Sequence, residues 1–177
     1  MGGSARGRTL LGPKGFQFRP TTGQVKEFIF SYIGQNIEEA KILDLFAGTG
    51  SLGIEALSRG AKEVIFVERE LQSLNILKKN LQMCKFWERA HIVRGDAFRI
   101  LQKFERNGEV FDFILADPPF KDGLRGRILR GVGKSSLLNA QGLLILEHEA
   151  HDPDRGAHGL TLLKQRKFGH CVISIYT

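Results

Sequence analysis

Four consecutive residues, Asp117-Pro118-Pro119-Phe120, combine the groups that recognise an amine on a nucleobase. The two prolines fix the backbone and hold Asp117 extended at the end of an apolar run, residues 111–116. The proline carbonyls have no local N–H partner, so they can accept a hydrogen bond from a ligand. Phe120 offers a face on which a planar base can stack. A rigid turn would explain the prolines, but the whole set fits an exocyclic amine.

A second stretch, residues 41–50, begins as a short apolar run and ends in glycines, and an amphipathic segment, residues 52–59, follows directly. Strand, glycine turn and helix are the start of a nucleotide-binding α/β unit. Asp44 stands inside the apolar run. A buried carboxylate needs partners there, and a cationic or hydrogen-bond-donating ligand would supply them. The structural alternative is a carboxylate that caps a helix or braces a loop.

The glycine turn also fits the dinucleotide fingerprint G-x-G-x-x-G, as Gly48-Thr49-Gly50-Ser51-Leu52-Gly53, and Glu68 follows at the distance of a ribose-binding carboxylate. A nicotinamide-dependent oxidoreductase is therefore one hypothesis. Asp44 argues against it, because a dinucleotide brings no cation to that strand, whereas a ligand with an ammonium group does.

The rest of the chain alternates between strand and helix patterns. We expect strands over 64–68, 91–93, 111–116 and 142–147, and helices over 71–81, 97–104 and 123–138. A capping box of Thr21 and Gln24 opens an amphipathic helix that extends to residue 33. Two last apolar runs, 160–163 and 171–176, flank 164–170 as a hairpin. The predicted fold is α/β and Rossmann-like: a seven-stranded, mostly parallel sheet with a C-terminal antiparallel hairpin strand and helices on both faces.

Polar residues follow each of the first four predicted strands. Gly48 and Gly50 follow the first, Glu68 the second, Asp96 the third and Asp117 the fourth. Asp96 also stands where it can cap the next helix. Because ligands of parallel sheets bind at the carboxyl ends of the strands, we expect these residues to form one site.

Length and charge indicate the class of protein. The 177 residues predict a single domain over 1–177, with a small N-terminal arm or hairpin over 1–20, outside the main core, and a catalytic core over 21–177. The net charge of +7 is concentrated in residues 1–26 and 121–134, which favours a nucleic-acid partner. No apolar run approaches the length of a membrane span, and Cys84 and Cys171 form no zinc spacing. We therefore expect a cytoplasmic protein with no membrane partner and no metal.

Taken together, the motifs resemble class I S-adenosylmethionine-dependent methyltransferases that carry a D-P-P-[FY] motif. More narrowly, the chain is similar to the bacterial RsmD family in Gly3–Arg8, Pro13–Gly15, Arg19–Thr22, Asp44–Gly50, Glu55–Ala61 and Asp117–Phe120. The resemblance implies methylation of the N2 amine of a guanine in small-subunit (16S) ribosomal RNA. It also implies S-adenosylmethionine as cofactor, S-adenosylhomocysteine as product, and ribosomal RNA within the small subunit as partner.

The resemblance assigns roles by position. Asp117, Pro118, Pro119 and Phe120 would be catalytic. The cofactor would be bound at its methionine end by Asp44 and the backbone of Phe46, Ala47, Gly48, Thr49 and Gly50, at its ribose by Glu68 beside Arg69, and at its adenine by Asp96 and Ala97. Asp117 would also contact the cofactor, in addition to its catalytic role. Arg19, Pro20 and Thr21 would close the site beside the target base. We expect the remaining basic candidates to grip RNA phosphates around the same strand ends: Arg6, Arg8, Arg125, Arg127 and Arg130.

Three alternatives stay open at this stage. The nearest is an amino-methyltransferase acting on adenine N6 of DNA or RNA. The second is the nicotinamide-dependent oxidoreductase. The third is an RNA-binding assembly factor without catalysis, against which the intact carboxylates Asp44, Glu68, Asp96 and Asp117 speak.

Overall fold

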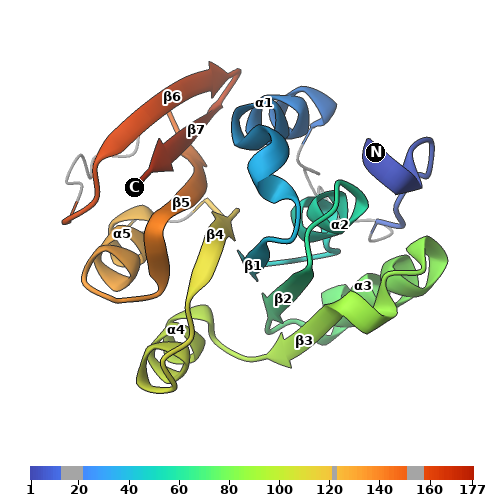
Figure 1. The fold of residues 1–177 in the computed structure, drawn as a ribbon, viewed down its shortest axis with the longest axis horizontal. Helices are drawn as coiled ribbons and strands as arrows, with labels where there is room; N and C mark the ends of the chain where they lie inside the picture. Colours follow the sequence, from blue (N-terminus) through green and yellow to red (C-terminus); the bar gives the residue numbers. More distant parts are fainter. Residues whose placement is uncertain (13–21, 121–122, 151–157) are drawn as a thin grey trace.

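The computed structural model describes residues 1–12, 22–120, 123–150 and 158–177. Its centre is a seven-stranded sheet in the order β3-β2-β1-β4-β5-β7-β6 (Figure 1). The strands are β1 Lys41–Leu45, β2 Glu63–Glu68, β3 Ala90–Arg94, β4 Phe111–Ala116, β5 Leu138–Glu149, β6 Leu162–Phe168 and β7 Cys171–Tyr176. Strands β1 to β5 are parallel, and β7 is antiparallel to both of its neighbours. The predicted α/β sheet with a C-terminal antiparallel hairpin is confirmed.

Helices cover both faces of this sheet, as predicted. They are α1 Gly23–Ile33, α2 Ser51–Ser58, α3 Leu71–Cys84, α4 Ala97–Arg106 and α5 Leu124–Gly133, with short 3-10 turns at Gly3–Ala5, Gly34–Ile37 and Trp87–Arg89. Helices α1, α2 and α3 pack on one face and α4 and α5 on the other (Figure 1). Successive strand side chains point to opposite faces, so Ile42 joins the first core and Leu43 the second.

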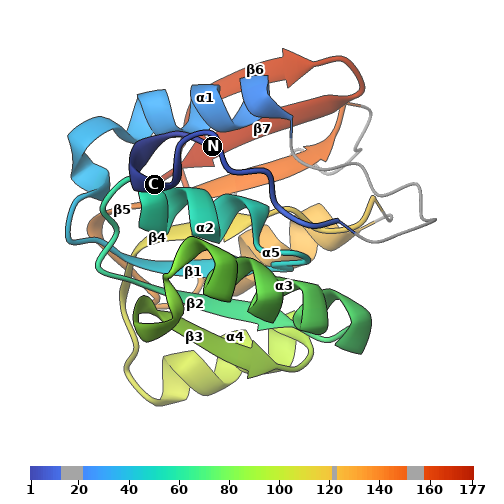
Figure 2. The ribbon, with the colours of Figure 1, turned by 90° about the vertical axis from the view of Figure 1, so that its right-hand side faces the viewer.

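Strand directions place the functional end of the sheet. In Figure 2 the arrows of β2 and β3 point the same way, and α2 and α3 run back along the sheet from the ends of the strands that precede them. The carboxyl ends of β1 to β5 therefore lie together on one side of the molecule. In the described residues, no helix is both long enough and apolar enough to span a bilayer.

Several element boundaries differ from the sequence prediction, and β5, for example, spans Leu138–Glu149 where 142–147 was predicted. Thr22, not Thr21, caps α1 by accepting from the Val25 N–H, and Thr21 lies outside the described residues. Helix α5 ends at Gly133, where the prediction ran to 138. Residues 164–167 belong to strand β6, where a turn was predicted. Because β6 is an edge strand with exposed side chains, its sequence lacks the apolar alternation that marks a half-buried strand.

The start of the chain packs against the core, which corrects the prediction that it lies outside. Residues 1–12 contain a 3-10 turn, Gly3–Ala5, and no strand of a hairpin. Ala5 is 2% exposed and its N–H donates to Ser58 Oγ at 2.8 Å, while the Gly2 N–H donates to Glu55 Oε1 at 2.8 Å. Small residues allow this close approach to α2. The prediction was based on the glycines and arginines of this segment, and such a composition does not reveal packing. Residues 13–20 lie outside the described part.

Replacing Gly3 by alanine is expected to destabilise the fold more than the same change at Gly7. Both glycines have a positive φ, +62° and +82°, so alanine is strained at either position. A Cβ on Gly3 would lie 1.9 Å from the Ser58 carbonyl oxygen, whereas nothing lies within 4 Å of one on Gly7. We expect losses in the free energy of unfolding of about 2–4 kcal/mol and about 1 kcal/mol, respectively, by urea denaturation. Equal losses would contradict the packing of residues 1–12 on α2.

Candidate active site

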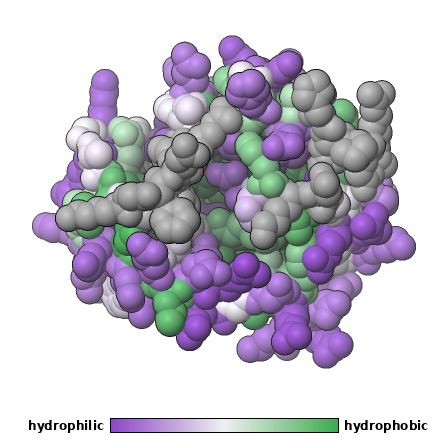
Figure 3. Space-filling view, turned by 180° about the vertical axis from the view of Figure 1, so that it is seen from behind, coloured by the Kyte–Doolittle hydropathy of each residue, from purple (hydrophilic) through white to green (hydrophobic). Residues whose placement is uncertain are grey.

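A cavity of about 730 Å³ opens at the carboxyl ends of the parallel strands. Figure 3 looks onto this side of the molecule, where hydrophobic surface shows in a hollow that hydrophilic side chains surround. The predicted site residues that line the cavity are Asp44, Phe46, Ala47, Gly48, Thr49, Glu68, Arg69, Asp96, Ala97, Asp117, Pro118, Pro119, Phe120 and Arg127. The fold therefore brings together residues that are far apart in the sequence: Asp44 and Arg127 are separated by 83 positions.

Gly50 is the one predicted cofactor-binding residue that does not line the cavity. It caps α2 with a φ of +87°, and a Cβ there would lie 2.4 Å from Leu77 Cδ1 and 2.9 Å from Ile54 Cδ1. The turn and the close packing of the helices thus both require glycine at position 50, because a side chain there would point into the core.

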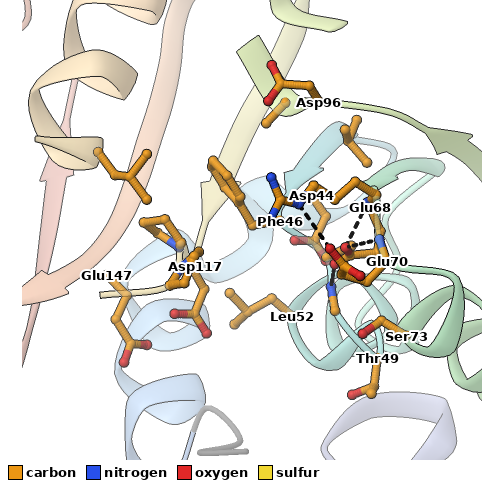
Figure 4. A pocket seen from close by; sticks show the side chains of 18 of the residues that line it. Asp44, Phe46, Thr49, Leu52, Glu68, Glu70, Ser73, Asp96, Asp117 and Glu147 are labelled. Atoms are coloured by element: carbon orange, nitrogen blue, oxygen red, sulfur yellow. Dashed lines mark hydrogen bonds and ion pairs between the residues drawn. The ribbon is translucent and has the colours of Figure 1, made fainter. Parts of the chain in front are cut away.

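Glu68 holds the glycine turn in place. Its Oε2 accepts from the Gly48 N–H at 2.7 Å, and its Oε1 accepts from the N–H groups of Arg69 and Glu70 at 2.7 and 2.9 Å (Figure 4). Phe46, at the start of the turn, has a φ of +62°, which costs free energy in a non-glycine residue. A strained backbone fixed by a carboxylate from the neighbouring strand is a preorganised ligand-binding loop.

Asp44 is buried under the first turn of α2. Its Oδ2 accepts from the Gly53 N–H at 2.9 Å, and a Cβ on Gly53 would lie 2.8 Å from the same oxygen. Burial raises the pKa of Asp44 to about 8; the Gly53 N–H opposes this shift, and the charges of Asp117 and Glu68 add to it. The Asp44 side chain therefore fixes the first turn of α2, and a cation beside it would favour its ionised form.

Replacing Asp44 by asparagine is expected to flatten the pH dependence of stability. Between an unfolded pKa of 3.8 and a folded pKa of about 8, the folded protein retains a proton that the unfolded chain releases, so stability falls as pH rises through this range. Asparagine can still accept from the Gly53 N–H, and it does not titrate. Thermal unfolding at about pH 5 and about pH 8 measures the effect. If stability fell by the same amount from about pH 5 to about pH 8 in wild type and in Asp44→Asn, the burial of Asp44 would be contradicted.

One wall of the cavity is aromatic. Asp96 Oδ1 caps α4 by accepting from the Phe98 and Arg99 N–H groups, both at 3.1 Å, which confirms the predicted cap. The rings of Phe46 and Phe98 meet edge to face at 6.1 Å, and the Arg127 guanidinium lies 3.8 Å from the centre of the Phe98 ring. This wall therefore offers aromatic ring faces beside a cation, groups against which a purine can pack.

Asp117 lies at the end of β4. In Figure 4, Leu52 lies between Asp117 and Glu68. Pro118 is buried and Phe120 is 39% exposed, so the aromatic ring of the motif is available at the rim. Glu147 of β5 lines the cavity beside this motif, and sequence reasoning missed it. The signal was present, because Glu147 ends the predicted fifth strand as Asp117 follows the fourth.

Three predicted RNA-contacting arginines are not placed as expected. Arg125 is buried at 8% exposure and donates to the Tyr176 hydroxyl at 3.0 Å, so it ties α5 to β7. Arg8 donates to the Met83 carbonyl at the end of α3, and Arg6 follows the turn that packs on Ser58 at the end of α2. Both helices run away from the cavity, so Arg6 and Arg8 do not flank the strand ends. Arg127 and Arg130 are exposed, and Arg19, Pro20 and Thr21 lie outside the described residues.

The chain resembles known methyltransferases over its whole length. The family model described as Conserved hypothetical protein 95 matches residues 1–177. Ribosomal RNA small subunit methyltransferase D of Haemophilus influenzae is 35% identical over 177 residues, covering 99% of this chain and 91% of the relative. A solved structure from Escherichia coli, named as the methyltransferase yhhF, is 30% identical with a TM-score of 0.87, covering 99% of this chain and 94% of that one. A methyltransferase solved with S-adenosylhomocysteine has a TM-score of 0.68 at 18% identity, covering 87% of this chain and 48% of that one, which shows the fold alone. Because the family model spans the whole chain and the first of these relatives is covered almost completely, this chain belongs to the RsmD family of methyltransferases.

Proposed function

We propose that the protein transfers the methyl group of S-adenosylmethionine to the N2 amine of a guanine in small-subunit ribosomal RNA. The observation that carries the proposal is the position of Asp117-Pro118-Pro119-Phe120, which lines the same cavity as Asp44 and Glu68. The same cavity thus offers hydrogen-bond acceptors for an ammonium group and a ribose, at Asp44 and Glu68, and for a base amine, at Asp117. The name of the 35% identical relative, a small-subunit rRNA methyltransferase, supports the substrate class.

The residues of the cavity fit the cofactor. Asp44, whose pKa burial raises to about 8, would accept from an ammonium group and be stabilised in its ionised form. Glu68 would accept from ribose hydroxyls with the lone pairs that its backbone partners leave, and Asp96 would accept from the adenine amine beside the Phe98 ring. When bound, S-adenosylmethionine supplies a methyl group on a sulfonium, which is already an activated leaving group.

Asp117 and the Pro118 carbonyl would prepare the target amine. The amine lone pair of guanine is delocalised into the ring, which makes the nitrogen a poor nucleophile. Two acceptors that bind both N–H groups would rotate the amine and turn its lone pair out of the ring, and Asp117 would take the proton that the nitrogen loses. Phe120 would stack on the base. Catalysis then comes mainly from positioning and from fixed charges in a sheltered site.

The target base must leave its helix or loop to reach Phe120. The exposed arginines Arg127 and Arg130 of α5 are next to the motif in sequence and could hold the flanking phosphates. The substrate would be the small subunit or its RNA, in the cytoplasm where ribosomes assemble.

Removing Arg127 and Arg130 together is expected to weaken RNA binding regardless of sequence. Each lost phosphate contact lowers the slope of log affinity against log salt by about one, so the double alanine variant should lose about two. The matched control is Arg6→Ala/Arg8→Ala, which removes the same charge from the far ends of α2 and α3 and should keep the slope. Filter binding of ribosomal RNA over a salt series measures both. A normal slope in Arg127→Ala/Arg130→Ala would show that α5 does not contact RNA.

The proposed function is tested with labelled S-adenosylmethionine and unmodified ribosomal RNA or small subunits. We expect N2-methylguanosine when the labelled nucleoside is identified by mass spectrometry. N6-methyladenosine would instead establish the adenine alternative. Absence of transfer, with RNA still bound, would favour the assembly factor, and NADH binding in place of S-adenosylmethionine would favour the oxidoreductase.

A further inference from the structure

Glu147 is a buried carboxylate in the cavity, and it has no role in the reaction proposed above. It is 7% exposed and lies near the carboxyl end of β5. It lines the main cavity and also a smaller hollow of about 230 Å³ between the start of α1 and the turn that joins β6 to β7. In Figure 4 its carboxylate and that of Asp117 point toward the same part of the cavity.

The register of the sheet explains why these two carboxylates are neighbours. Ala116, the last residue of β4, pairs with Leu146 of β5, so Asp117, directly after β4, and Glu147 of β5 each come one position later at the same end of the sheet. Adjacent strands are about 4.8 Å apart, and residues in register share a face of the sheet. Asp44 pairs with Leu115, two residues before Asp117, which puts it on that same face. The three carboxylates therefore lie on one face of the sheet, with Asp117 and Glu147 at the same level and Asp44 two positions further from the strand ends.

The pair of carboxylates Asp117 and Glu147 matches the hydrogen-bonding edge of guanine. On that edge, the N2 amine and the N1–H are adjacent donors, so an acceptor for the amine needs a second acceptor at its side. Adenine has its amine next to N1 as well, but its N1 carries a lone pair and no hydrogen. An ionised carboxylate accepts only, so it binds the guanine N1–H and repels the adenine N1.

We propose that Glu147 selects guanine by accepting the hydrogen bond of its N1–H while Asp117 binds the neighbouring amine. This inference rests on the proposed function and adds the residue that sets its base specificity. Enzymes that act on an extruded base read it by hydrogen bonds to this edge. A binding site built around a donor rejects an analogue that presents a lone pair at that position, because two acceptors repel each other.

The test replaces the mapped target guanine of the ribosomal RNA by 2-aminopurine, which keeps the amine but has a lone pair at N1. We expect wild-type protein to favour guanine by about 100-fold in kcat/KM. In Glu147→Gln the amide can accept from guanine or donate to 2-aminopurine, so the preference should fall to about 10-fold or less. Glu149→Gln is the matched control, because Glu149 is exposed on the same strand and does not line the cavity; it should keep the wild-type preference.

The outcomes separate this inference from the function on which it rests. N2-methylguanosine formed by wild type, together with an unchanged preference in Glu147→Gln, would overturn the role of Glu147 alone. No N2-methylguanosine from wild type would overturn both. Equal rates of wild type on guanine and 2-aminopurine would also overturn the inference. Should Glu147→Gln fail to fold, Glu147→Ala replaces it: because 2-aminopurine also lacks the O6 carbonyl of guanine, a preference that falls relative to wild type supports the inference and an unchanged one overturns it.

Discussion

Asp117→Asn is expected to lower kcat for RNA methylation by roughly a thousandfold, within the range that a lost general base typically costs. Asparagine keeps the shape of the side chain, but its amide has no charge with which to take the proton of the amine, and its NH2 group can face the amine with a donor. Binding of S-adenosylmethionine should not weaken, because the Asp117 charge raises the pKa of Asp44 and its removal favours the ionised form of that carboxylate. Single-turnover kinetics and calorimetry measure the two effects separately.

Asp112→Asn provides the control on the same strand. Asp112 Oδ2 accepts from the Lys41 N–H at 2.7 Å at the opposite end of β4, so its loss can reduce stability and should leave kcat per folded molecule unchanged. A near-normal kcat in Asp117→Asn would show that Asp117 does not take part in the chemical step. A large loss of cofactor affinity with normal kcat would assign Asp117 to the cofactor and not to the base.

Glu68→Gln is expected to weaken S-adenosylmethionine binding by about 10- to 100-fold. Two effects act together. The variant loses charge-assisted hydrogen bonds to the ribose hydroxyls, and a single amide oxygen cannot accept from Gly48, Arg69 and Glu70 as the two carboxylate oxygens do. The glycine turn should therefore loosen in the absence of cofactor, and calorimetry measures the affinity.

Glu70→Gln is the matched control, because Glu70 also lines the cavity, and within the described part of the chain its side chain pairs only with the exposed Arg69, at 3.1 Å. Exposed pairs contribute little, so its affinity should stay within about twofold of wild type. Wild-type affinity in Glu68→Gln would contradict the proposed cofactor orientation. Equal losses in both variants would point to the net charge of the cavity and not to the position of Glu68.

Much of the fold follows from local pattern. The strand over 111–116 has the predicted bounds, and Asp96 caps α4 as expected, because apolar runs and capping residues act over a few neighbouring positions. The ends of parallel strands meet at one edge of a sheet, so the order of strands and helices was enough to predict that Glu68, Asp96 and Asp117 line one cavity.

Local sequence patterns therefore predict the type of sheet, the edge that binds ligands and most residues of the cavity. Which charges face the ligand depends on how the helices and strands pack. Arg125 and Arg127 are two positions apart on α5, yet one is buried against Tyr176 and the other lines the cavity, because helix rotation and the docking of β7 set their directions. Glu147 likewise becomes the neighbour of Asp117 through the β4–β5 register, a pairing across 30 positions that backbone hydrogen bonds create and local pattern does not encode.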